Sequence, residues 1–134
     1  MAALAKNGTP SLCTAIPEGG ERVGTFISAE VIGAGDACHL NASGQAIRSN
    51  GAAADANAKV IGWAGINVNV GEPLTLWVNI NYGYGTATTV VPDTVYYLSG
   101  TVLGGLDTVA SVGGTKPIAV GLPNGRLHVI RFLG

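Results

Sequence analysis

Charged side chains are scarce in this sequence. They make up 11% of the 134 residues, less than half of the roughly 25% that is usual for soluble domains. The seven basic and eight acidic residues are scattered singly and give a formal net charge of −1. No basic patch is present to neutralise phosphate groups, so nucleic acid is not an expected partner. A surface with so few charges also does little to keep copies of the chain apart.

Long apolar segments are missing as well. Gly, Asn or Asp interrupts the apolar stretches well short of the roughly 20 residues that a membrane-spanning helix needs, so no membrane partner is expected. The first six residues lack the charged start, long apolar middle and cleavage site of a secretory signal. We therefore expect synthesis in a cytoplasm, where Cys13 and Cys38 stay free thiols. A disulfide between them is the competing interpretation.

No apolar stripe at helical spacing persists for three turns. Short apolar stretches instead recur with Gly, Asn, Asp and Pro between them, which is typical of strands and turns. The alanine-rich residues 51–58 are too few for a stable helix, so we expect a loop or a single turn there. The sequence predicts an all-β domain with strands over residues 22–28, 37–40, 46–48, 60–64, 74–78, 86–91, 95–98, 118–122 and 127–132.

Asn-Gly pairs give the strongest tight-turn signals, because both central residues of a type I′ turn need a positive φ that Asn and Gly tolerate. Asn50-Gly51 is one such pair, and Pro123-Asn124-Gly125 is predicted to join the last two strands as a hairpin. Residues 1–21 are rich in Gly and Pro and hold no periodic apolar segment long enough to fold alone. We predict an extended N-terminal arm over residues 1–21 and a single β domain over residues 22–134.

A weak internal repeat runs through the β domain. In each half, a turn with Asp opens a strand, a second strand follows a Lys, and a turn then leads to an apolar strand. The spacing from Asp36 to Lys59 equals that from Asp93 to Lys116. Chance matches are common in a sequence so rich in Gly and Ala, so the repeat supports only two weakly similar β units within one domain. The matched segments are 35–40 with 92–98, 59–64 with 116–121, and 74–78 with 127–130.

No arrangement of side chains points to catalysis, a metal site or a cofactor. Cys38 and His39 are adjacent, so on a strand they face opposite sides and cannot form a nucleophile–base pair. His128 alternates with the apolar Leu127 and Val129, which predicts a histidine facing solvent or an interface. The glycine pairs lack the strand-to-helix context and the Lys of a phosphate-binding loop. Four carboxylates fall in the arm, at a strand boundary or in a turn rather than as a matched pair: Glu18, Glu21, Glu30 and Asp36.

Aromatic residues make up only 6% of the chain, and three of them lie close together in sequence. Trp77, Tyr82 and Tyr84 are predicted to form a subunit interface, because Trp and Tyr are enriched in protein contacts. A stacking platform for sugar is the alternative. Stacking of nucleic-acid bases is not expected, since no basic groove accompanies the aromatic residues.

Several segments resemble the small capsid decoration (cement) proteins of tailed phages. They are the Gly/Ala-rich run at 33–48, Val-Ile-Gly-Trp-Ala at 60–64 and Gly-Glu-Pro-Leu-Thr-Leu at 71–76. Residues 92–100, 118–121 and 126–132 look like the companion pattern in head-fibre and decoration sequences. The resemblance implies a small β-barrel or β-tulip that forms a homotrimer and carries no catalytic motif.

The same resemblance implies a place and a partner. The chain is expected on the outer surface of a virion, bound to the major capsid protein and stabilising the shell. The arm is then the expected clamp, because an extended segment can add a strand to an exposed edge of the shell protein. Its candidate capsid-binding residues are Leu4, Pro10, Leu12, Ile16 and Pro17. A receptor- or glycan-binding module of a phage fibre or tail is the alternative, and a small unrecognised enzyme is the third possibility.

Overall fold

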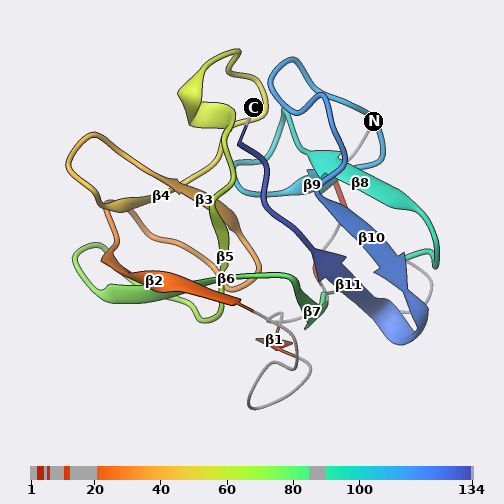
Figure 1. The fold of residues 1–134 in the computed structure, drawn as a ribbon, viewed down its shortest axis with the longest axis horizontal. Coiled ribbons are helices and arrows are strands. Elements are labelled where there is room, and N and C mark those ends of the chain that lie inside the picture. The colour runs from red at the N-terminus through yellow and green to blue at the C-terminus, as the bar shows by residue number, and fades with distance from the viewer. Residues whose placement is uncertain (1–2, 5, 7–10, 13–20, 85–89, 134) are drawn as a thin grey trace.

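The computed structural model describes residues 3–4, 6, 11–12, 21–84 and 90–133. These residues form two antiparallel β-sheets and two short 3-10 turns, which confirms the prediction of an all-β protein (Figure 1). The two sheets lie side by side, and no closed barrel is found among the described strands. The barrel or tulip form implied by the resemblance is therefore not shown.

The first sheet is built from the N-terminal half of the chain. Along β6, the buried Leu74, Leu76 and Val78 alternate with more exposed residues, so one face of the strand packs into the core. The edges of this sheet approach each other at an isolated bridge between Ser28 and Ala46. In spatial order the strands are β2 (Glu21–Ile27), β6 (Pro73–Val78), β5 (Gly62–Ala64), β3 (Ala37–Leu40) and β4 (Ala46–Arg48).

The second sheet holds the C-terminal strands and one short strand of the arm. The predicted hairpin between β10 and β11 is confirmed: Asn124 has φ 68° and Gly125 has φ 73°, both in the left-handed region. In spatial order the strands are β1 (Ser11–Leu12), β7 (Ile80–Gly83), β11 (Arg126–Val129), β10 (Ala119–Leu122), β8 (Val95–Leu98) and β9 (Leu106–Asp107).

The chain passes from one sheet to the other at Asn79, whose φ of 54° breaks the extended run between β6 and β7. At the other end, the C-terminal segment returns to the first sheet, where Phe132 and Val60 exchange two backbone hydrogen bonds. Trp63 lies at this junction, fully buried, and its indole Nε1–H donates to the carbonyl oxygen of Ile130 at 3.0 Å. The main hydrophobic core therefore contains residues from both sheets.

The two sheets share one strand order. The first runs β2-β6-β5-β3-β4, and the second runs β7-β11-β10-β8-β9 with β1 added beside β7. Each strand of the second series therefore comes five strands later along the chain than its counterpart in the first series. The equal order gives β2 and β7 corresponding places, but β7 has β1 on its outer side and β2 is the last strand of its sheet.

Most predicted strands lie within two residues of observed ones, and three short strands were missed: β1, β7 and β9. Most of the predicted strand over 86–91 lies outside the described residues, and residues 90–91 are not in a strand. Residues 51–58 contain a single 3-10 turn, Ala56–Ala58, as predicted. Asn50-Gly51 lies in a turn, but this turn joins no hairpin. Gly51 is needed there for space, because a Cβ at this position would collide with the carbonyl oxygen of Ser99.

Candidate functional site

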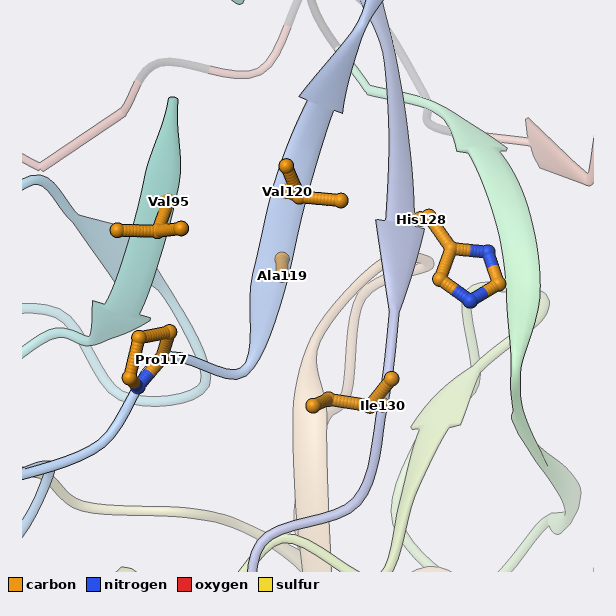
Figure 2. Close-up of a pocket in the computed structure, with 6 residues that line it drawn as sticks. All are labelled: Val95, Pro117, Ala119, Val120, His128 and Ile130. Carbon is orange, nitrogen blue, oxygen red and sulfur yellow. The ribbon is translucent and has the colours of Figure 1, made fainter. Parts of the chain in front are cut away.

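An apolar hollow of about 170 Å³ opens on the second sheet (Figure 2). Along β8, the exposed Val95 alternates with the buried Tyr96 and Leu98, so the strand turns Val95 toward the hollow and the two larger side chains into the core. The lining comes from β8, β10, β11 and the residues next to them: Val95, Pro117, Ala119, Val120, His128 and Ile130.

His128 is the single titratable side chain in this apolar hollow. It lies on the opposite face of β11 from the buried Leu127 and Val129, as its alternation predicted. Its Nδ1 is 2.8 Å from Oδ1 of Asn81, which fixes the orientation of the ring. A hollow with one tethered imidazole among aliphatic side chains offers neither a pair of acid–base groups nor the convergent polar groups that bind a polar substrate.

Large aliphatic side chains are exposed elsewhere on the described surface too. Val112 is 70% exposed, Val70 is 62% exposed and Val31 is 59% exposed. Single exposed aliphatic residues are ordinary in proteins. Here they occur on a chain with 11% charged residues, so few charged groups separate them. A surface with so few charges does little to repel other copies of the chain or other proteins.

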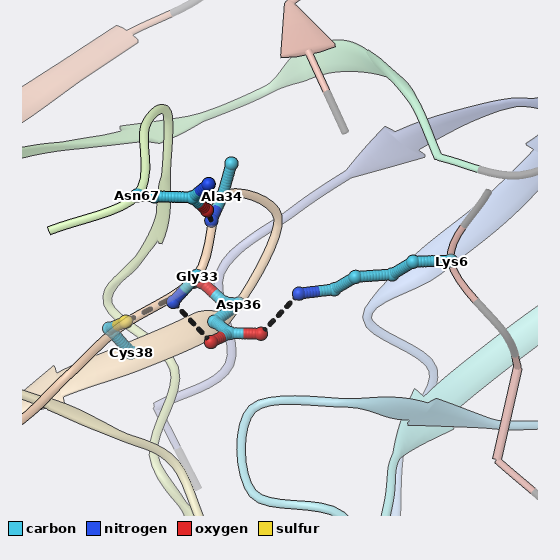
Figure 3. A network of polar contacts seen from close by, with 6 residues as sticks. All are labelled: Lys6, Gly33, Ala34, Asp36, Cys38 and Asn67. Carbon is cyan, nitrogen blue, oxygen red and sulfur yellow. Dashed lines mark hydrogen bonds and ion pairs between the residues drawn. The ribbon is translucent and has the colours of Figure 1, made fainter. Parts of the chain in front are cut away.

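A polar network connects the arm to the body (Figure 3). Lys6 Nζ lies 2.7 Å from Oδ1 of Asp36, a residue only 6% exposed. The other carboxylate oxygen of Asp36 accepts the Gly33 N–H at 2.8 Å, and the neighbouring Ala34 N–H donates to Asn67 Oδ1 at 2.8 Å. Asp36 thus joins the turn before β3 to the arm.

The described arm residues lie on the body of the same chain. The Leu4 N–H donates to the Leu106 carbonyl oxygen at 2.8 Å, and the Leu4 side chain packs against the main core. Ser11 and Leu12 form β1, which pairs with β7. The described arm residues therefore lie at the two ends of the second sheet, Leu4 beside β9 and β1 beside β7. Of the other candidate clamp residues, Pro10, Ile16 and Pro17 lie outside the described residues.

The three aromatic residues of the predicted interface are not equivalent. Tyr84 is 1% exposed and packs in the main core, so the folded chain does not present it to a partner; burial also raises the pKa of its hydroxyl. Tyr82 lies in β7. Trp77 is half-buried and lines a second hollow of about 420 Å³ with Thr25 and Thr75, whose Oγ1 atoms are 2.8 Å apart.

Cys38 and His39 form no catalytic pair. Cys38 is buried and unpaired, and burial raises the pKa of its thiol, which keeps it protonated and unreactive. His39 Nδ1 lies 3.3 Å from Ser49 Oγ. Cys13 lies outside the described residues. Within the described part of the chain, no group of three or more His, Cys, Asp or Glu side chains could hold a metal ion.

Glu30 and Arg48 form an ion pair that the sequence did not reveal. Glu30 accepts the backbone N–H of Arg48 at 2.8 Å and its guanidinium at 3.1 Å. Burial raises the pKa of the Glu30 carboxyl, but these bonds and the charge of Arg48 outweigh burial and hold the pKa below 4.5. The pair links the segment after β2 to β4, close to the Ser28–Ala46 bridge, and has a structural role.

His39 gives the protein an expected sensitivity to mild acid. Burial lowers its pKa from 6.5, against the opposing effects of a hydrogen bond to Asn57 and the charges of Glu30 and Asp55. The unfolded chain therefore binds the proton first, so the free energy of unfolding should fall as pH drops below 6.5. Glu30 contributes only below its ordinary value of 4.5.

A His39→Gln variant tests this expectation. Its free energy of unfolding, measured by urea denaturation at about pH 7.5 and about pH 5, should change less between the two pH values than that of the wild type. An equal change in both proteins would place the acid sensitivity at another group.

Comparisons with protein-family models, curated protein sequences and solved structures found no match to this chain. Among the described residues, the structure contains no helix long and apolar enough to cross a membrane. The candidate site therefore rests on the geometry above, with the apolar hollow as its main feature.

Proposed function

We propose that this chain is a structural protein of a tailed-phage particle that binds the outer surface of the capsid and stabilises the shell. The observation that carries the proposal is the apolar hollow on the second sheet, which has a single imidazole among aliphatic side chains and no charged partner. An apolar surface of this kind fits a protein contact that removes it from water.

The low charge of the chain is compatible with close packing against many identical neighbours. A capsid offers the same contact many times, so weak individual contacts add up when the bound copies also touch one another. The homotrimer, the compact barrel-like or tulip-like form, the major capsid protein as partner and the virion as location belong to this proposal. Synthesis in the host cytoplasm completes it.

Substitution of Val120 provides the test. Val120 lines the apolar hollow and is half-buried, so Val120→Lys places a charge where the proposed contact excludes water. Co-sedimentation with shells assembled from the particle's own coat protein, without this chain, should show affinity reduced by at least about tenfold, since each 1.4 kcal/mol is a factor of ten.

Val70→Lys is the matched control, because Val70 is exposed and lies in the turn before β6. It should bind the shells like the wild type, and both variants should unfold at similar temperatures. Wild-type protein that does not co-sediment with the shells would refute the proposed function. Equal binding by wild type and Val120→Lys would remove the hollow from the contact.

The hollow beside Trp77 favours a second candidate, a glycan-binding module of a fibre or tail. An indole next to the hydroxyls of Thr25 and Thr75 offers a stacking surface and hydrogen-bonding groups for a sugar ring. Binding to a glycan array that is lost in Trp77→Ala would support this candidate, and an array without signal would reject it.

A further inference from the structure

The outer strands of the two corresponding five-strand series are β2 and β4 in the first and β7 and β9 in the second, and three of these four have a neighbouring segment among the described residues. The arm lies beside β9 through the Leu4–Leu106 hydrogen bond, and β1 pairs with β7. The segment after β2 lies beside β4, where the Ala29 N–H donates to the Ala46 carbonyl oxygen at 2.9 Å. The fourth edge, the outer side of β2 over residues 21–26, has no strand or backbone partner within the described part of the chain.

The ladder between β2 and β6 shows which backbone groups this edge offers. The Ser28 N–H donates to the Glu72 carbonyl oxygen at 2.9 Å, and this bond sets the alternation along the two strands. Thr25 and Thr75 then form a non-hydrogen-bonded pair, as the 2.8 Å between their hydroxyl oxygens also indicates. The backbone N–H and C=O of Thr25 therefore point away from β6, toward the outer edge.

The second sheet shows what such an edge binds. In the shared strand order, β2 pairs with β6 and the corresponding β7 pairs with β11. Thr25 on β2 faces Thr75 on β6, and Gly83 on β7 faces Arg126 on β11. The outward side of Gly83 is paired with Ser11 of β1. The strand that corresponds to β2 thus already binds an extended strand on its outer side in this molecule.

Among the described residues, every strand already has a place in one of the two sheets, so none of them is left to pair with this edge. Each copy has one β1 strand, and that strand already pairs with β7. Pairing of β2 with β2 of a second copy would close a twofold dimer and could not build a threefold ring. We propose that the outer edge of β2, centred on Thr25, binds an extended strand of the shell protein. This inference rests on the proposed function and assigns the shell a second contact besides the apolar hollow.

Two substitutions at Thr25 separate the backbone from the side chain. Thr25→Pro removes the outward N–H and places a ring on the edge, while the ladder to β6 does not use that N–H. Thr25→Val removes only the hydroxyl. Affinity for the undecorated shells should fall by at least about tenfold in Thr25→Pro and stay within about threefold of wild type in Thr25→Val.

Hydrogen exchange of the wild-type Thr25 amide gives an independent test of the inference. This test does not depend on whether Thr25→Pro folds. The amide should exchange rapidly in the free protein and slowly on the shells. Equal shell binding by wild type and Thr25→Pro, or an amide already protected in the free protein, would overturn the inference while leaving the proposed function intact. If light scattering shows that Thr25→Pro loses self-association while its shell binding is unchanged, the strand bound at β2 belongs to a second copy and the inference is wrong.

Wild-type protein that does not bind the shells would remove the proposed function and this inference together.

Discussion

Replacement of Trp63 by alanine is expected to destabilise the protein by roughly 3–5 kcal/mol, the usual cost of removing a buried aromatic side chain. Trp63 is 0% exposed and belongs to the core that contains residues of both sheets. Whole domains have only about 5–15 kcal/mol of stability, so this single cavity removes a large share. Thermal unfolding should show a midpoint lower by roughly 10–20 °C.

Trp63→Phe separates packing from hydrogen bonding. Phenylalanine keeps most of the ring volume but cannot donate to the Ile130 carbonyl oxygen, which Trp63 reaches at 3.0 Å. This variant should lose about 1–2 kcal/mol, well short of the alanine variant. Val95→Ala, on the exposed side of β8, should stay close to the wild type. An unchanged unfolding midpoint in Trp63→Ala would show that the two sheets do not depend on this shared contact.

Local sequence rules predicted the elements that local chemistry determines. The hairpin at Pro123-Asn124-Gly125 follows from two residues that tolerate a positive φ, and φ values of 68° and 73° are observed there. The strand over residues 95–98 was predicted with its observed bounds, because a turn with Asp93 opens an apolar stretch there. In both cases the deciding residues are neighbours in sequence.

Elements that depend on distant partners were missed. The strand β7 contains Asn81 and Gly83, which read as turn residues, and it becomes a strand by pairing with β11 and β1. Tyr84 was predicted at an interface because Trp and Tyr are enriched in protein contacts, yet the fold buries it. Lys6 and Asp36 are 30 positions apart, and only the tertiary structure shows that they form an ion pair.

Only part of the candidate site could be predicted from the sequence. The alternation of Leu127, His128 and Val129 placed the histidine on the face away from the core. The apolar hollow itself also needs Val95 and Pro117, which lie on or beside other strands and reach the same place through the sheet order. The outer edge of β2 likewise depends on topology, because only the strand order shows that no other described strand pairs there.

A single substitution in the arm, Lys6→Met, is expected to destabilise the whole body. Methionine keeps a long apolar stem over the site but leaves the Asp36 side chain, 9% exposed, without its cation. Breaking a buried ion pair by removing one partner costs about 3–5 kcal/mol. The Lys6 side chain is 29% exposed, so water screens part of this loss, and about 2–3 kcal/mol is the expected cost.

The double variant Lys6→Met with Asp36→Asn shows whether the loss comes from the unpaired charge. An asparagine oxygen can still accept the Gly33 N–H that Asp36 accepts at 2.8 Å, and no buried charge remains. Urea unfolding should therefore show the double variant to be more stable than Lys6→Met alone. If Lys6→Met unfolds like the wild type, the arm does not stabilise the body through this pair, and removal of the arm becomes a clean test of the capsid clamp. If the loss is found, shell binding by arm variants has to be compared at equal folded fractions, because the same residues then support the fold.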